Sequence, residues 1–277
     1  MSDTRERDIH TWGNWGQGPS FWRRVAKADQ RLLLLDYDGT LAPFTPERDR
    51  AFPYPEVPEL LRALQQAGRT RVVLVSGRES SVVARLLGLD PPPEIWGCHG
   101  GEHLAPDGTL TPVSLSDTQR DGLRQAAALA DEAGAGTNLE YKPGCVALHW
   151  RGAQEAGLRT TANMLHENWQ KLSQTFALAL HPFDGGLELR AAHLSKAHAV
   201  KTLVAEVPAA TSAAAYLGDD RTDEDGFAAL GECGLSVLVR KQWRPTLASL
   251  WLVPPEELLQ FLRRWLQAAR HGDDETI

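Results

Sequence analysis

Two acidic residues stand directly after a short apolar run. The run Leu32 to Leu35 leads into Asp36-Tyr37-Asp38-Gly39-Thr40. Carboxylates two residues apart on a strand point the same way, and they repel each other unless a cation lies between them. Mg²⁺, which prefers carboxylate and phosphate oxygens, would remove that penalty. Because Asp-Gly is also a common turn pair, a solvated turn at a strand end is the alternative.

A second acidic run follows a second apolar segment. Gly218 is followed by Asp219-Asp220-Arg221-Thr222-Asp223-Glu224-Asp225, which holds five acids in seven positions. Asp219 lies at the predicted strand end and Asp223 one helical turn further on, so both carboxylates can face one ion. A few acids at a helix start also oppose the helix dipole favourably, which is the alternative reading of the same run.

Two more polar positions follow apolar segments. Ser76-Gly77-Arg78 closes the run 71–75, where a hydroxyl can bind a phosphoryl oxygen, although Ser-Gly is also an ordinary turn pair. Lys196 begins a predicted helix after Leu194-Ser195, and a single lysine at such a place is usually solvated.

The elements around these positions predict an α/β fold. Short, continuous apolar runs at 32–35, 71–75 and 213–217 are typical of strands buried on both faces of a parallel sheet. Each is followed by a helical pattern, at 58–67, 80–87 and 223–230. This alternation predicts a doubly wound, mainly parallel sheet. Ligands bind beyond the carboxyl ends of such strands, so Asp36, Ser76 and Asp219 are expected to converge.

The middle of the chain predicts an inserted, smaller α+β cap. A helix is expected at about 117–133, strands at 138–142 and 146–151, a helix at 155–172, and strands at 176–181 and 187–190. We therefore expect a first core part at 1–106, the cap at 107–190 and a second core part at 191–277. The second core part holds a predicted helix at 195–206 and an apolar helical stripe within 255–270.

Composition and charge limit the kinds of partner that the protein is expected to bind. The chain has 277 residues and a net charge of −7, and it lacks a long basic block, so we expect no nucleic-acid binding. Its apolar runs are too short to span a membrane, and residues 1–17 contain no apolar signal region. Three widely spaced cysteines predict no disulfide framework. We expect a cytoplasmic monomer acting on a small molecule.

In sequence order the four polar pieces resemble the haloacid dehalogenase superfamily: Asp-x-Asp-Gly-Thr, a strand-end Ser, a Lys, and Gly-Asp-Asp-x-x-Asp. A finer resemblance is to trehalose-6-phosphate phosphatases, and it extends into the cap. It is carried by Gly97 to Glu102, Leu139 to Lys142, Ala147 to Arg151, Leu187 to Arg190 and Leu217 to Phe227. Ala197 and Ala191 depart from the family's usual glycine and proline, and neither change removes a reacting group.

The resemblance implies a Mg²⁺-dependent phosphatase for a sugar phosphate, with trehalose 6-phosphate the preferred substrate. Asp36 would be the nucleophile and Asp38 the general acid and base. The remaining roles that it implies are metal binding by Asp36, Asp38 (through its backbone carbonyl), Asp219 and Asp223; phosphate binding by Thr40, Ser76, Gly77 and Lys196; and substrate binding by Arg78, His99, Glu140, Lys142, His149, Arg151 and Glu188.

Several alternatives remain open from the sequence. Charged residues on alternate positions of a strand usually face water, and His149 on an apolar strand is as easily a core histidine as a sugar contact. The same core chemistry would serve another sugar phosphate, such as a glycosylglycerate phosphate, or a phosphomutase. A catalytically inactive sugar-phosphate sensor is disfavoured because Asp36, Asp38, Asp219 and Asp223 are all present.

Overall fold

The structure, a computed structural model, describes residues 10–15, 18–45, 47–150, 156–183 and 185–274. A nine-stranded sheet forms its larger part, in the order β1-β13-β12-β11-β2-β3-β4-β5-β6. Neighbours from β1 to β4 are parallel, whereas β4, β5 and β6 are antiparallel. The strands are β1 (His10–Thr11), β2 (Gln30–Leu35), β3 (Thr70–Val75), β4 (Glu94–Gly97), β5 (Glu102–Leu104), β6 (Leu110–Pro112), β11 (Ser212–Gly218), β12 (Leu235–Val239) and β13 (Leu250–Leu252).

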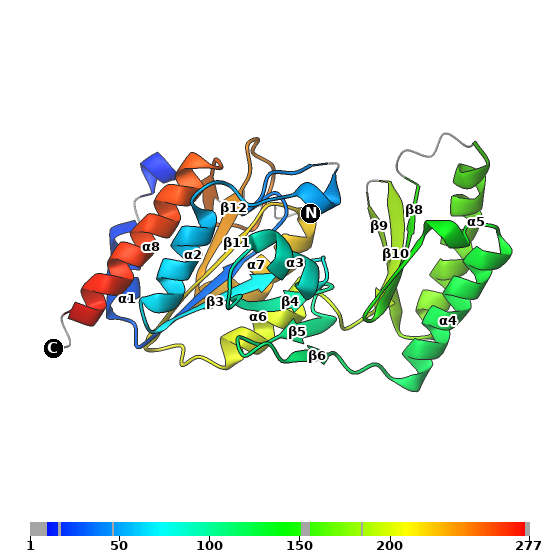
Figure 1. The fold of residues 1–277 in the computed structure, drawn as a ribbon, viewed down its shortest axis with the longest axis horizontal. Helices are drawn as coiled ribbons and strands as arrows, with labels where there is room; N and C mark the ends of the chain where they lie inside the picture. The colour runs from blue at the N-terminus through cyan, green and yellow to red at the C-terminus, as the bar shows by residue number, and fades with distance from the viewer. Residues whose placement is uncertain (1–9, 16–17, 46, 151–155, 184, 275–277) are drawn as a thin grey trace, which may run out of the picture.

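Helices cover both faces of this sheet (Figure 1). Leu33 and Leu35 of β2 pack with α1, α2, α3 and α8, whereas Leu32 and Leu34 pack with α6 and α7. The alternation follows from the strand repeat of two residues. The helices are α1 (Gly18–Lys27), α2 (Val57–Gln66), α3 (Ser80–Leu87), α6 (Lys196–Ala205), α7 (Arg221–Leu230) and α8 (Glu256–Asp274). The predicted doubly wound α/β fold is confirmed.

The smaller part is a four-stranded antiparallel sheet in the order β7-β8-β10-β9, with two helices on one face (Figure 1). Its apolar side chains face those helices and form a cluster of their own. The elements are α4 (Asp117–Glu132), β7 (Leu139–Lys142), β8 (Cys145–His149), α5 (Ala156–Thr175), β9 (Leu178–Phe183) and β10 (Gly186–Ala191). We call this unit the cap, as expected from the sequence.

The segment boundaries at about 107 and 190 stay predictions. Sheet pairing assigns β6 to the large sheet, since it is hydrogen-bonded to β5, and the chain enters the cap only after Pro112. Short 3₁₀ turns complete the described structure, namely η1 (Trp12–Asn14), η2 (Arg48–Arg50), η3 (Gly136–Asn138) and η4 (Gly231–Cys233).

Helix α1 was not predicted from the sequence, although Phe21, Trp22 and Val25 recur at helical spacing and lie on its buried side. Its aromatic side chains explain its place: Trp22 packs against Phe261 of α8 with ring centroids 5.2 Å apart, and Phe21 lies 6.0 Å from Trp265. The amphipathic pattern and the packing of its apolar side against α8 together stabilise this helix. In the part of the chain that the structure describes, no helix has the length and apolar character needed to cross a membrane.

The cap's apolar layer gives a matched stability test. Leu148 of β8 is fully buried, whereas Tyr141 of β7 is 60% exposed. We expect Leu148→Ala to lower the free energy of unfolding by about 2–5 kcal/mol, because it leaves a cavity. We expect Tyr141→Ala to change it by less than about 0.5 kcal/mol. Urea denaturation followed by circular dichroism measures both, and equal effects would contradict the described packing.

Candidate active site

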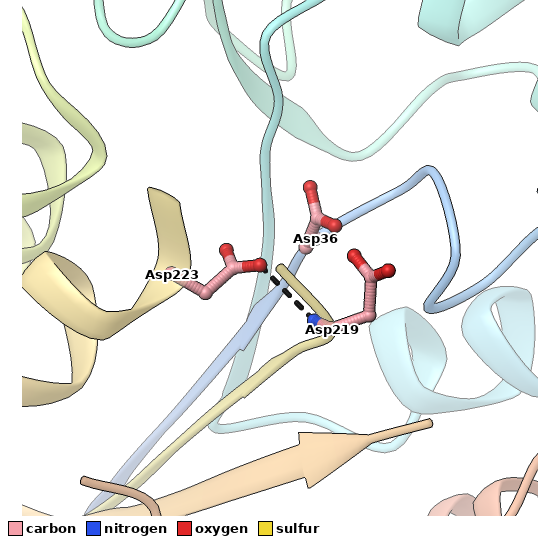
Figure 2. Close-up of side chains that lie close together, drawn as sticks. All are labelled: Asp36, Asp219 and Asp223. Atoms are coloured by element: carbon pink, nitrogen blue, oxygen red, sulfur yellow. Dashed lines mark hydrogen bonds between the residues drawn. The ribbon is translucent and has the colours of Figure 1, made fainter. Parts of the chain in front are cut away.

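Three carboxylates gather beyond the carboxyl ends of two neighbouring strands. Asp36 follows β2 and Asp219 follows β11, and Leu35 and Leu217 are paired in register just before them. Asp223 comes from the first turn of α7. One oxygen of each of the three carboxylates lies within 4.8 Å of the others. Figure 2 shows Asp36 and Asp219 pointing to the same side, beyond the strand ends.

The Asp223 carboxylate is already fully engaged with the protein. Its Oδ2 accepts hydrogen bonds from the backbone N–H groups of Asp219 (3.0 Å) and Asp220 (2.9 Å), and the first of these is the dashed line in Figure 2. Its Oδ1 accepts from the Lys196 ammonium at 2.7 Å and from the Tyr216 hydroxyl. Asp223 therefore shapes the loop that presents Asp219.

Lys196 is a buried cation between two acids. Ser195 caps the start of α6, and the Lys196 ammonium donates to Asp36 at 2.6 Å as well as to Asp223. Burial opposes its charge, but Asp223 and Asp36 keep its pKa above the ordinary value. With all three carboxylates ionised, this group would carry a net charge of −2, and burial raises the pKa of Asp36 well above its ordinary value. Burial, followed by the charge of Asp223, raises the pKa of Asp219 to about 7.

The group fits a divalent cation. Its oxygen donors and net negative charge suit Mg²⁺. Gly39 has a positive φ of 78°, and a Cβ there would lie 2.1 Å from Oδ2 of Asp219, so only glycine lets that carboxylate approach the loop after β2. The Arg240 guanidinium lies 3.9 Å from Oδ2 of Asp219, too far for a hydrogen bond, which leaves the carboxylate able to bind an ion.

Asp38 lies apart from the three carboxylates and pairs with Arg78. The guanidinium donates to both carboxylate oxygens, at 2.6 and 2.7 Å, and its third hydrogen bond goes to the backbone oxygen of Arg48 at 2.6 Å. Arg78, predicted to bind substrate, therefore holds the Asp38 side chain in this structure. The backbone-carbonyl role of Asp38 at the metal stays a prediction.

Of the predicted phosphate-binding residues, Thr40 and Lys196 contact the Asp36 carboxylate. Thr40 is fully buried, and its hydroxyl lies 3.3 Å from Oδ2 of Asp36. Ser76 is also buried, and its hydroxyl accepts from the backbone N–H of Arg78 at 3.1 Å. Gly77 lies under the His99 ring, because a Cβ there would be 2.6 Å from Nε2 of His99.

A cavity of about 700 Å³ opens over this group. Six of the predicted residues line it, together with aromatic and basic side chains that the sequence did not single out. The predicted ones are Asp36, Asp38, Gly77, His99, Lys196 and Asp219, and the others include Phe44, Tyr54, Arg240 and Lys241. The apolar run that precedes each acid and the turn that follows it explain why Asp36, Asp38 and Asp219 were predictable, whereas His99 and Lys196 were assigned a role only through the family resemblance.

The predicted cap residues lie together on the face of the small sheet opposite α4 and α5. Glu140 accepts from His149 at 2.7 Å and lies 3.1 Å from the Lys142 ammonium. The Arg48 guanidinium of η2 donates to the same carboxylate at 3.2 Å, so this face contacts the large part. Although burial opposes it, these three partners hold the pKa of Glu140 well below its usual range.

The other predicted cap residues are placed as follows. Glu188 is buried, with Lys142 at 3.9 Å and Arg190 at 3.5 Å. His149 is partly exposed beside Glu140 and is not a core histidine. Arg151 lies outside the described residues. Among those that the structure describes, no predicted cap residue lines the cavity described above.

Two charged residues were missed by the sequence analysis. Arg190 shares the cap's charged face with Glu188, and the alternation in Leu187-Glu188-Leu189-Arg190 was the signal that could have found it. Arg48 lies in a loop without periodicity, and no sequence pattern connects it to Glu140.

Comparison with known proteins decides the family. A family model described as trehalose-phosphatase matches residues 34–250. The chain belongs to the trehalose-phosphatase family. It is 32% identical over 252 residues to the trehalose-phosphate phosphatase of Mycobacterium ulcerans and 33% identical over 245 residues to that of Mycobacterium marinum. Each match covers 84% of this chain but 60% of the relative's length.

Solved structures agree on the fold of this trehalose-phosphatase family member. The trehalose-6-phosphate phosphatase of Aspergillus fumigatus has a TM-score of 0.65 at 24% identity, covering 91% of this chain and 97% of that chain. A haloacid dehalogenase-like hydrolase from Bacteroides thetaiotaomicron has a TM-score of 0.63 at 16% identity, covering 85% and 99%. The resemblance to the trehalose-phosphatase family, stated from the sequence, is confirmed.

Metal binding can be tested apart from catalysis. Mg²⁺ at one hundred times its dissociation constant should raise the free energy of unfolding of the wild type by ~2.7 kcal/mol. We expect Asp219→Asn to lose most of this gain, because the site loses a charged oxygen ligand. Thermal unfolding with and without Mg²⁺ measures the difference.

Asp225→Asn is the matched control, since Asp225 belongs to the same acidic run but is exposed. It should keep the wild-type response to Mg²⁺. An undiminished response in Asp219→Asn would contradict the assignment of the site.

Proposed function

We propose that this protein is a Mg²⁺-dependent phosphatase that hydrolyses trehalose 6-phosphate to trehalose and phosphate through an aspartyl-phosphate on Asp36. One observation carries the proposal. The Asp36 carboxylate faces a cavity with one oxygen fixed by a buried ammonium group, and a second strand-end carboxylate, that of Asp219, stands beside it. Family membership and the relatives named above support the choice of substrate.

The nucleophile is held in place before substrate binds. Lys196 fixes one oxygen of Asp36 at 2.6 Å, and the Thr40 hydroxyl lies 3.3 Å from the other. The carboxylate then attacks phosphorus, a bond forms between an Asp36 oxygen and phosphorus, and the bond from phosphorus to the sugar oxygen breaks. Lys196 remains beside the equatorial phosphoryl oxygens, where negative charge accumulates.

Asp38 is the proposed proton carrier. It would give a proton to the departing sugar oxygen, and then take one from the water that hydrolyses the aspartyl-phosphate. The two hydrogen bonds from Arg78 fix the orientation of its carboxylate. Because the Arg78 guanidinium occupies both carboxylate oxygens in this structure, proton transfer through Asp38 requires the pair to open.

A bound Mg²⁺ would supply charge neutralisation between the substrate phosphate and the acidic group. Asp36 and Asp219 are the side chains that would hold it. Asp223 would keep the Asp219 loop in shape through its two backbone hydrogen bonds.

The cap's charged face is the proposed sugar site. Glu140, Lys142 and Glu188 offer donors and acceptors for hydroxyl groups, and they are already held by one another. Such a prearranged set lowers the entropy lost on binding. We further propose that the protein acts in the cytoplasm as a monomer, on the grounds of composition given above.

The first test is phosphate release from a panel of sugar phosphates, with Mg²⁺ and with a chelator. We expect the highest kcat/KM for trehalose 6-phosphate, and no release with the chelator. Mg²⁺-dependent release from a different sugar phosphate, such as a glycosylglycerate phosphate, would retain the mechanism and reject the substrate. A rearranged sugar phosphate as product would indicate a phosphomutase, and no release at all would favour a sensor.

The nucleophile has its own test. We expect Asp36→Asn to lower kcat at least about 1,000-fold, since the amide cannot form the phospho-enzyme, while the fold is kept because Lys196 still pairs with Asp223. Phosphate release and circular dichroism measure the two effects. The control is Asp29→Asn, which changes an exposed acid just before β2. Activity near the wild-type level in Asp36→Asn would show that another group is the nucleophile.

A further inference from the structure

A buried arginine in the cap is poorly satisfied by the protein. Arg190 lies near the end of β10 on the charged face and is 5% exposed. Its guanidinium has five N–H donors, yet its described contact is one long hydrogen bond of 3.5 Å to Oε1 of Glu188. Among the described residues, its Nε has no hydrogen-bond partner at all.

Two further side chains near Arg190 could accept a hydrogen bond, Asp225 of α7 and His181 of β9, but neither is hydrogen-bonded to it among the described residues. Cys145 stands opposite it on β8, and Lys142 is the next charged group along the same row of paired residues. Burial lowers the pKa of Arg190, and Glu188 only partly opposes this. A buried cation without hydrogen bonds is costly, so an acceptor from outside the protein would be bound favourably here.

A second unsatisfied group lies in the loop next to this face. His99 lines the cavity, and its Nδ1 is buried without a partner among the described residues. Cys98 and His99 both have left-handed backbone, with φ of 51° and 55°. Non-glycine residues rarely adopt this conformation, and such strain concentrates at functional sites. The loop therefore holds His99 over Gly77 at a conformational cost.

The His99 loop and the Arg190 end of the cap are packed together. A Cβ on Gly101 would lie 2.4 Å from the backbone oxygen of Pro143, in the turn between β7 and β8. The backbone oxygen of Gly144 in that turn accepts from the N–H of Ala191 at 2.9 Å. After burial, the charge of Arg190 is the largest influence that lowers the pKa of His99, followed by Lys196. These backbone contacts place the residue after Arg190 beside the loop that carries His99, which lines the cavity.

We propose that Arg190 is a substrate-binding residue that donates through Nε to an oxygen of the sugar ring that carries the phosphate, beside His99, whose Nδ1 contacts the same ring. This assignment rests on the proposed function, in which a sugar phosphate is the substrate. With the phosphoryl group at Asp36 and Lys196, the attached ring extends toward the cap and meets these two groups first. Sugar hydroxyls both donate and accept, so one ring satisfies both.

The competing role for Arg190 is structural, as a partner that only steadies Glu188. The two roles differ in what they do to substrate selectivity. A sugar contact affects sugar phosphates and spares esters without hydroxyl groups, whereas a structural role affects both alike.

The test compares Arg190→Lys and Arg190→Gln in the full chain with Mg²⁺. Arg190→Lys keeps the charge and removes the Nε donor, so it is informative even if Arg190→Gln fails to fold, which thermal unfolding would show. We expect the ratio of kcat/KM for trehalose 6-phosphate to kcat/KM for phenyl phosphate to fall by about tenfold to hundredfold, because a hydrogen bond from a charged group is lost. Most of this loss should come from a higher KM for trehalose 6-phosphate. Arg124→Lys, an exposed pair with Asp121 on α4, is the control and should keep the ratio.

Each outcome bears on the proposal. An unchanged ratio in both variants, or an equal loss on the two esters, would overturn the role of Arg190 while leaving the phosphatase intact. If the wild type prefers another sugar phosphate, trehalose 6-phosphate is rejected as the substrate. The ratio of kcat/KM for that sugar phosphate to kcat/KM for phenyl phosphate then tests the role of Arg190. If the wild type hydrolyses none, calorimetric binding of trehalose 6-phosphate replaces turnover, and absence of binding to the wild type overturns both proposals.

Discussion

The active site depends on one buried ammonium group. Lys196 lies between Asp36 after β2 and Asp223 in α7, and all three side chains are nearly or fully excluded from solvent. Removing one partner from such a group leaves an uncompensated buried charge, which typically costs about 3–5 kcal/mol. Lys196 therefore holds the ends of two elements together and orients the proposed nucleophile at the same time. The strands and helices of the large sheet serve to bring these three residues to one edge.

Charge is distributed differently in the two parts of the molecule. The core group carries an excess of negative charge, which suits a metal ion, and it lies at the carboxyl ends of parallel strands. The cap's charged face pairs Glu140 with Lys142 and Glu188 with Arg190, so it is close to neutral. A neutral face rich in donors and acceptors suits hydroxyl groups, whereas the core suits a phosphate dianion with its metal. The core group therefore suits the phosphate end of a sugar phosphate, and the charged face of the cap suits its sugar end.

Much of the fold was predictable because burial on both faces produces unmistakable apolar runs. The runs before Asp36 and Asp219 predicted their strands and, through the rule for strand ends, the meeting of the two acids. The direction in which each side chain points could not be predicted from the sequence. Arg78, expected at the substrate, donates to both oxygens of Asp38, because a guanidinium matches a carboxylate in two-point geometry once the loop brings them together. Its contact with the substrate stays a prediction.

Helix α1 and the contact of Arg48 with the cap were not predicted from the sequence, for a different reason. Their positions depend on contacts with residues more than ninety positions away, in α8 and in the cap, and no local pattern encodes such contacts. The cap residues Glu140 and Glu188 were found only through family resemblance, since alternation on a strand shows which face a side chain shares but not what that face binds.

Beside the packing of Gly101 against the turn between β7 and β8, a polar contact made by Arg48 links the two parts. The apolar clusters of the large sheet and of the cap share no residues among those described. Arg48 joins them by a side-chain bond to Glu140 and by a backbone bond to Arg78, which holds Asp38. An ion pair this exposed contributes at most about 1 kcal/mol, so it cannot by itself fix the orientation of the cap. Since polar interfaces between domains usually permit relative motion, a shift of the cap would pull on the loop that positions Asp38. Arg48 of η2 thus contacts both Glu140, a proposed sugar contact in the cap, and Arg78, which holds the proposed proton carrier Asp38 in the core.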